Sequence, residues 1–203
     1  MQNKNYHLMM TCLVSGTKKD GGDWYRSTLR RRGDDGKPQS KDFFIDAEYG
    51  ETFVRENKLE DIPVTPVFGF DRFFNAAVIG LTPTGSSSVP TFGNSATASS
   101  LKNKDYNLMM TCMVSGTKKD GGNWYRATLR RRGDDGKPQS KDFFIDAEYG
   151  EKFISENKLE DIPVTPVFGF DRFFNAAVIG LTPTGSSSVP TSGTSTTSTS
   201  KGD

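Results

Sequence analysis

Between residues 24 and 32, one tryptophan and three of the four arginines fall on even-numbered positions, and Tyr25, Ser27 and Leu29 are among the residues between them. If this segment is a β-strand, the alternation places all four on one face of a sheet. Aromatic rings stack on unpaired bases and guanidinium groups bind phosphate, so the pattern is typical of proteins that bind single-stranded nucleic acid with little regard to sequence. The alternative is a solvated strand face on which the tryptophan closes the end of a barrel. The four residues are Trp24, Arg26, Arg30 and Arg32.

The chain of 203 residues repeats itself with a period of 100. Over positions 1–100 the two halves differ at 15 positions, and they are identical from Glu56 to Thr91. Such near-identity indicates a recent or engineered duplication, and a period this long predicts two complete small domains. We therefore expect copy 1 at residues 1–84 and copy 2 at residues 105–184. A Gly/Ser/Thr-rich composition predicts a flexible linker over 85–104 and a disordered tail over 185–203.

Catalytic chemistry has little support in the sequence. His7 is the one histidine of the chain, and copy 2 has Asn107 in its place. The serines at 86–88 have no histidine nearby to activate them, and the glycine-rich nucleotide-binding patterns are absent. Asp34 and Asp35 lie beside glycine, where acidic residues more often form a turn than bind a metal. We expect a protein that is not an enzyme and needs no cofactor or metal.

Five short strands and one short helix are predicted in each copy. In Tyr6–Val14, alternation puts Leu8, Met10, Cys12 and Val14 on one face, so Cys12 is expected to be a buried thiol. The same reasoning points Phe43 and Ile45 inward. The small size and the strand count favour an all-β fold, a five-stranded Greek-key barrel of the oligonucleotide/oligosaccharide-binding (OB) type. The predicted strands are Tyr6–Val14, Trp24–Arg32, Lys41–Ala47, Ile62–Phe70 and Phe73–Leu81, and the predicted helix is Glu51–Asn57.

Charge is segregated along each copy, although the whole chain carries only +1. Residues 18–41 contain eight basic and four acidic residues, a net charge of +4, whereas residues 42–71 contain two basic and eight acidic residues, a net charge of −6. A positive hairpin on a negative body suits a protein that directs a polyanion to one groove. Phe70, Phe73 and Phe74 flank a polar hairpin tip, where they could be core, contact or base-stacking residues.

Two segments resemble the helix-destabilising gene V proteins of filamentous phages, which bind single-stranded DNA. The first is Gly36-Lys37-Pro38-x-Ser40 at the hairpin tip. The second is Thr65–Pro83, which has Gly69 before a turn and ends Ile79-Gly80-Leu81-Thr82-Pro83. In that family the first hairpin is a DNA-binding wing, and the last hairpin forms a loop at a two-fold dimer axis. The resemblance implies that a covalent pseudo-dimer replaces the homodimer here.

The alternation and the resemblance together give the candidate nucleic-acid-binding residues. By position, the resemblance implies a wing that includes Lys37 and Lys41, and it implies that Phe70, Arg72 and Phe73 lie near the dimer-axis loop. The full set is Trp24, Arg26, Arg30, Arg32, Lys37, Lys41, Phe70, Arg72 and Phe73, with Trp124, Arg126, Arg130, Arg132, Lys137, Lys141, Phe170, Arg172 and Phe173 in copy 2.

The expected function is binding of single-stranded DNA, with RNA left open, in phage or plasmid replication. The alternative from another class is a tandem protein–protein interaction or virion structural module. No apolar run approaches the ~18 residues of a membrane-spanning helix, and no signal-peptide core is visible, so a bacterial cytoplasm is expected. The apolar stretch Phe73–Leu81 is expected to pair with Phe173–Leu181, within one chain or by exchange between chains.

Overall fold

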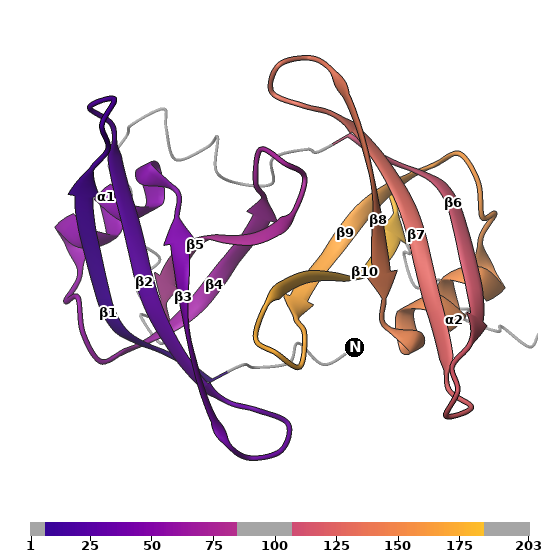
Figure 1. Cartoon of the computed structure of the whole chain (residues 1–203), viewed down its shortest axis with the longest axis horizontal. Coiled ribbons are helices and arrows are strands. Elements are labelled where there is room, and N and C mark those ends of the chain that lie inside the picture. Colours follow the sequence, from indigo (N-terminus) through magenta and orange to yellow (C-terminus); the bar gives the residue numbers. More distant parts are fainter. Residues whose placement is uncertain (1–6, 85–106, 185–203) are drawn as a thin grey trace, which may run out of the picture.

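The computed structural model describes residues 7–84 and 107–184, and the predicted linker and tail lie outside these ranges. Figure 1 shows the two copies, copy 1 in indigo to magenta and copy 2 in orange to yellow. The elements of copy 1 are β1 (Leu8–Thr17), β2 (Asp23–Arg32), β3 (Pro38–Ile45), α1 (Ala47–Glu56), β4 (Ile62–Phe70) and β5 (Ala76–Pro83). Those of copy 2 are β6 (Leu108–Thr117), β7 (Asn123–Arg132), β8 (Pro138–Ile145), α2 (Ala147–Glu156), β9 (Ile162–Phe170) and β10 (Ala176–Pro183).

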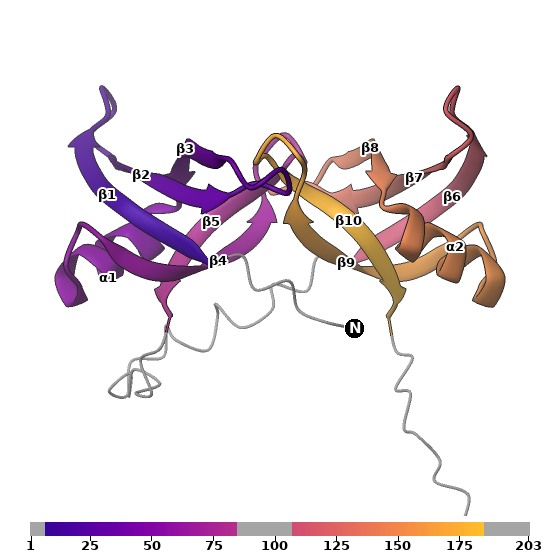
Figure 2. The same ribbon diagram turned by 90° about the horizontal axis from the view of Figure 1, so that it is seen from below.

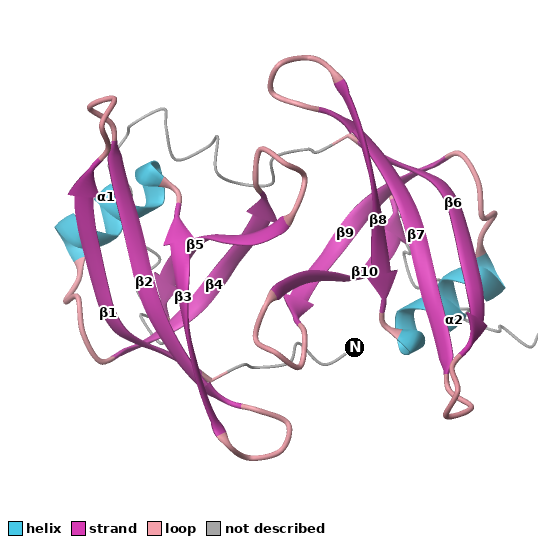
Figure 3. Ribbon diagram, in the orientation of Figure 1, coloured by secondary structure: helices cyan, strands magenta, loops and turns pink. Residues whose placement is uncertain are grey.

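Each copy is one curled antiparallel sheet of five strands, in the order β3-β2-β1-β4-β5 and its equivalent β8-β7-β6-β9-β10. The chain crosses from β3 to the far side of β1 through α1, which is the Greek-key arrangement of strands. The sheet curls until β3 and β5 meet, and there the backbone N–H of Asp46 donates to the carbonyl of Ile79 at 2.8 Å. The prediction of an all-β fold with two small five-stranded barrels is confirmed (Figure 3).

The predicted faces of the first strand are wrong beyond Met10, because β1 contains a bulge between Met10 and Cys12. A bulge inserts one residue, and the residues after it change faces. Leu13 is therefore buried opposite Ser27, Val14 is exposed, and Cys12 is only half-buried opposite Thr28. The strand also continues to Thr17, three residues beyond the predicted end at Val14.

The helix begins four residues earlier than the predicted Glu51. Asp46 caps it, since its carboxylate accepts from the backbone N–H of Glu48 at 3.1 Å. Gly50 lies inside the helix, where a Cβ would overlap the Tyr25 ring, so this glycine allows α1 to pack closely on β2. At the other end, the backbone N–H of Asn57 donates to the Phe53 carbonyl. The sequence-based boundary is wrong because a glycine that weakens an isolated helix is here required by packing.

One fully buried position carries different residues in the two copies. Ser27 is fully buried in copy 1, and its hydroxyl has only a long hydrogen bond, 3.4 Å, to the Cys12 carbonyl. Copy 2 has the fully buried Ala127 in the equivalent position. We expect Ser27→Ala to change the free energy of unfolding by less than about 0.5 kcal/mol, because the lost hydrogen bond is weak and the cavity is small. Urea denaturation measures this, and a loss above about 1.5 kcal/mol would contradict it.

The two copies are joined by the turn after β4 and its equivalent after β9, which we call the tip turns (71–75 and 171–175). Phe74, which is 1% exposed, belongs to the hydrophobic core of copy 2 and meets Phe143 edge to face at 5.3 Å. Phe174 enters the core of copy 1 in the same way and meets Phe43 at 5.4 Å. Each barrel thus completes its core with a phenylalanine from the other copy.

Arg31 and its equivalent Arg131 clamp these turns from the barrel side. Arg31 is only 9% exposed, and its guanidinium donates to the carbonyl of Asp171 at 2.8 Å and to the amide oxygen of Gln39 at 2.8 Å. The same guanidinium lies over the Phe174 ring at 4.5 Å from its centre. Hydrogen bonds and ring faces therefore replace the water around this buried charge. The two copies of one chain contact each other in the structure, while their assembly in solution stays a prediction.

Candidate nucleic-acid interface

The side of each sheet that faces away from the helix carries the tryptophan and the three arginines that the alternation in 24–32 places on one face. Directly opposed residues of antiparallel strands share a face. Arg26 is opposed by Val14 on β1 and by Phe44 on β3, and Thr28 is opposed by Cys12 and Asp42. We call this surface the outward face; it consists of Cys12, Val14, Trp24, Arg26, Thr28, Arg30, Arg32, Asp42 and Phe44, or the residues numbered 100 higher in copy 2.

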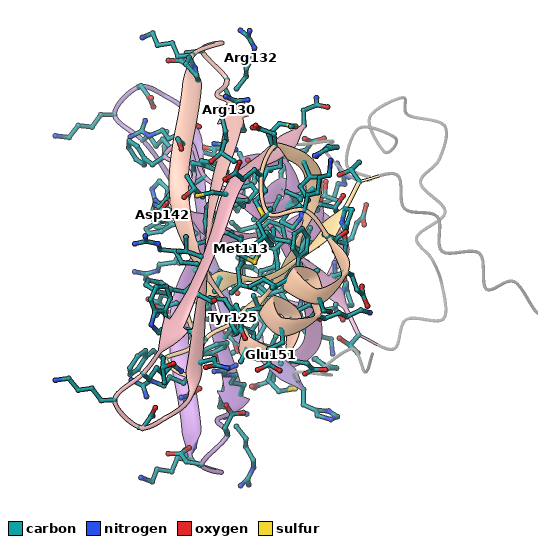
Figure 4. The ribbon with its side chains drawn as sticks, turned by 90° about the vertical axis from the view of Figure 1, so that its right-hand side faces the viewer. Met113, Tyr125, Arg130, Arg132, Asp142 and Glu151 are labelled. Carbon is teal, nitrogen blue, oxygen red and sulfur yellow. The ribbon has the colours of Figure 1, made fainter. Side chains whose placement is uncertain are left out.

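Figures 2 and 4 show where the outward faces lie on the molecule. In Figure 2 the β1–β2 and β6–β7 hairpins rise toward the same side, with the tip turns between the two copies. In Figure 4 Asp142 lies on one side of the copy 2 sheet, whereas Tyr125 and Glu151 lie on the other, where α2 packs. The two outward faces are therefore presented on one common side.

Trp24 lies flat over the neighbouring strand. It is opposed by Gly16 on β1, and a Cβ at that glycine would be 2.6 Å from the indole ring. The absence of a side chain at position 16 lets the indole settle onto the backbone of β1 and leaves it half-buried. The sequence predicted the face of Trp24 correctly, and the ring is partly open to a stacking partner.

Phe44 is an outward-face residue that the sequence analysis missed. Its side chain is 71% exposed, and Phe144 in copy 2 is 72% exposed. A single exposed apolar side chain is common on protein surfaces, so the exposure of Phe44 has to be interpreted from the residues beside it. The signal was present, because the alternation that points Phe43 and Ile45 inward must point Phe44 outward. Phe44 lies directly opposite Arg26, so the two side chains project from neighbouring positions of the same face.

The three predicted arginines lie on the outward face in different settings. Arg30 is exposed opposite Ser40, and Arg32 is exposed near the hairpin tip, where it donates to the Gly36 carbonyl at 3.3 Å. Arg26 lies 3.6 Å from the Asp42 carboxylate, and both side chains are about half exposed. Exposed guanidinium groups spaced along a strand are suited to successive phosphates.

The two predicted lysines are not brought together. Lys37 is at the exposed hairpin tip, 3.7 Å from Asp35. Lys41 is half-buried on the other side of β3, where its ammonium donates to the side-chain oxygen of Asn175. Lys141 makes the same contact with Asn75. Lys41 thus contacts the tip turn of the other copy and is not on the outward face.

The predicted tip residues also divide by role. Phe70 packs into the contact between the copies, where its ring meets Phe168 at 5.0 Å. Phe73 is 65% exposed, and the Arg72 guanidinium lies over its ring at 4.6 Å from the centre. In the other tip turn the carbonyl of Arg172 accepts from Gln39 at 2.9 Å, which places Arg172 and Phe173 at the β3 edge of copy 1. An exposed arginine–phenylalanine pair from the other copy therefore lies at the β3 edge of each barrel.

The tip turn is fixed by Asp71. Its carboxylate accepts from the backbone N–H groups of Phe73 and Asn75 at 2.9 and 2.8 Å and from the Asn75 side chain at 2.8 Å. Burial by itself raises the pKa of Asp71, but these hydrogen bonds and the charge of Lys141 outweigh it and lower the pKa overall. The pKa of Asp171 is lowered for the same reasons, with Lys41 as the neighbouring charge. The ionised carboxylate is the form that stabilises the turn.

Acid should therefore weaken the tip turns. A group whose pKa is lowered on folding stabilises the protein above its unfolded pKa, about 3.9 for aspartate, and loses that contribution as the pH falls through the folded pKa. We expect Asp71→Asn with Asp171→Asn to reduce the free energy of unfolding at pH 7, and the difference from the native chain to shrink steadily below about pH 4. Urea denaturation between pH 7 and pH 3 measures it. A difference that does not vary with pH would contradict the assignment.

Three further observations bear on the chemistry of the chain. Within residues 7–84 and 107–184, no cluster of three or more His, Cys, Asp or Glu side chains could hold a metal ion. No helix in that part of the chain is long and apolar enough to cross a membrane. The sequence matches no protein-family model and no curated protein.

Proposed function

We propose that this chain is a non-catalytic protein that binds single-stranded DNA on its two outward faces. The observation that supports this most is the juxtaposition of the exposed Phe44 ring with Arg26 on one face of the sheet, repeated as Phe144 and Arg126 in copy 2. An exposed ring can stack on an unpaired base while the adjacent guanidinium binds phosphate. A duplex would not satisfy Phe44, because its base faces are covered.

The expected binding free energy favours a single DNA strand that lies along the outward face of the sheet. Each base stacked on an aromatic ring contributes about 1–3 kcal/mol, and every base offers such a face, so binding requires no fixed sequence. Trp24 and Phe44 supply two platforms in copy 1, and the exposed Phe173 ring is available at the β3 edge of the same barrel. Arg30 and Arg32 extend the positive charge toward the hairpin tip. A single DNA strand lying on this face would contact aromatic rings and guanidinium groups in turn.

The biological setting belongs to the same proposal. The resemblance to gene V proteins supports a role in phage or plasmid replication, in the cytoplasm of a bacterial host, where such a protein covers exposed single strands. Six of the eight acidic residues of 42–71 lie between Asp46 and Asp61, in the segment that contains α1, on the other side of the sheet from the outward face. Asp42, on the outward face, and Asp71, in the tip turn, are the other two. This segregation would orient the polyanion toward the outward face.

Titration with oligo(dT), followed by the fluorescence of Trp24 and Trp124, tests the proposal. We expect quenching at low salt, an affinity that falls steeply as salt is added, and little competition from duplex DNA. An RNA competitor of the same length decides between DNA and RNA. Absence of quenching by a sample that circular dichroism shows to be folded would contradict single-strand binding and favour the protein–protein alternative.

A further inference from the structure

Asp42 is the one outward-face residue whose charge opposes the proposed ligand. It projects from the middle of β3, between Ser40 and Phe44 in the alternation, and it lies directly opposite Thr28. Its side chain is about half exposed. Asp142 stands in the same place in copy 2. A carboxylate in the centre of a phosphate-binding surface weakens binding unless it has another partner.

The structure holds this carboxylate in a fixed orientation. The hydroxyl of Thr28 donates to Oδ1 at 2.7 Å, and the guanidinium of Arg26 lies 3.6 Å from Oδ2. Copy 2 has the same two contacts at 2.7 and 3.6 Å, between Asp142 and the residues Thr128 and Arg126. An ionised carboxylate has about four acceptor sites, so these contacts leave sites free on both oxygens. Asp42 is thus a hydrogen-bond acceptor that is held in place and is exposed to solvent.

Its distance from the stacking platform matches the width of a base. Residues two apart on a strand lie on the same face about 6.6 Å from each other. A base stacked on Phe44 therefore brings its Watson–Crick edge within reach of the residue two positions earlier, which is Asp42. In a single strand this edge is unpaired and available for recognition. The base would be held by its face on Phe44 and read at its edge by Asp42.

We propose, resting on the function proposed above, that Asp42 and Asp142 are specificity-determining residues that favour guanine over thymine. Guanine offers two adjacent donors, N1–H and the exocyclic N2 amine, which match the two oxygens of a carboxylate. Thymine offers one donor between two carbonyl oxygens, and those oxygens repel a carboxylate. Cytosine and adenine offer one amine beside a ring acceptor. Binding is therefore tolerant of sequence but graded by base.

The test compares three oligonucleotides of equal length: oligo(dT), the same strand with a guanine at every third position, and that strand with inosine in place of guanine. Inosine keeps N1–H and lacks the N2 amine, so it isolates the second hydrogen bond. With the full native chain, we expect the guanine strand to bind at least about fivefold more tightly than oligo(dT), with the inosine strand between them.

The matched variant is Asp42→Asn with Asp142→Asn, which keeps the shape and removes the charge. We expect it to lose the preference for guanine over inosine and to bind oligo(dT) as tightly as the native chain or more tightly, because a repulsive charge is gone. Thr28→Val with Thr128→Val, which frees the carboxylate from its hydrogen bond, should reduce the same preference by a larger factor than it changes the affinity for oligo(dT).

Equal binding of the three strands by the native chain would overturn the inference. A guanine preference that persists in the Asp42→Asn and Asp142→Asn chain would overturn it too, because another group would then read the base. Weaker oligo(dT) binding by that variant would show that Asp42 merely holds Arg26 in place. In each of these outcomes the native chain still binds oligo(dT); a chain that binds none of the three strands contradicts the proposed function itself.

Discussion

Replacing Arg30, Arg32, Arg130 and Arg132 by glutamate is expected to weaken oligo(dT) binding by about two orders of magnitude at ~50 mM salt. All four side chains are exposed on the outward faces. Loss of two phosphate contacts per face flattens the slope of log affinity against log salt by about 1.4 for each bound strand, since each contact contributes about 0.7 for single strands. The measurement is the tryptophan titration repeated at several salt concentrations.

Lys58→Glu with Lys158→Glu is the matched control. These lysines are also exposed, but they lie in the acidic segment between the helix and the next strand. Reversing their charge should change the affinity by less than about twofold, because these lysines lie outside the outward faces and salt screens the interaction of exposed charges with a distant phosphate. Equal losses in the two sets of variants would mean that binding depends on net charge and is not confined to the outward faces.

Phe74→Ala with Phe174→Ala is expected to cause the largest loss of stability. Each ring is about 1% exposed in the core of the other copy, so truncation removes apolar burial and leaves a cavity. Comparable substitutions cost about 3–5 kcal/mol each. Because each ring connects one barrel to the other, the variant should also unfold at lower urea and separate the copies. Urea denaturation followed by far-UV circular dichroism measures the loss.

The neighbouring position supplies the control for this variant. Phe73 and Phe173 are about two-thirds exposed, so Phe73→Ala with Phe173→Ala should leave the free energy of unfolding within about 0.5 kcal/mol of the native chain. The same pair should weaken oligo(dT) binding, because a stacking platform at the border of each face is lost. The assignment is wrong if Phe73→Ala destabilises the chain as much as Phe74→Ala, or if Phe74→Ala leaves unfolding unchanged.

The strands and the charge pattern could be predicted because they depend on short-range alternation. The face that carries Trp24 and Arg30 can be read from the period of two residues, and Phe44 could have been assigned by the same rule. Cys12 could not, because a single inserted residue in β1 reverses the face of the later residues of that strand, and nothing in the sequence near Met10 marks the bulge. The helix start was missed because the need for Gly50 arises from packing against Tyr25.

The exchange of side chains between the two copies could not be predicted from the sequence. Phe74 and Phe174 are identical residues in identical surroundings, and no local pattern says in which copy a ring will be buried. Phe74 also has a positive φ of 62°, a conformation that a bulky residue adopts only when its surroundings hold it. Asp71 and the contacts with copy 2 supply those surroundings. Arg31, which alternation places on the inner side, is buried for the same reason: its partner Asp171 belongs to the other copy.

Photo-crosslinking tests the central claim, that single strands lie on the outward faces, most directly. An oligo(dT) in which 5-iodouracil replaces single thymines is irradiated in complex with the full chain, and the modified peptides are identified by mass spectrometry. We predict adducts on Phe44 and Trp24, on Phe73 at the border, and on the equivalent residues of copy 2. Adducts confined to the helices and the acidic segments, or a pattern unchanged when Phe44 and Phe144 are replaced by leucine, would contradict the account.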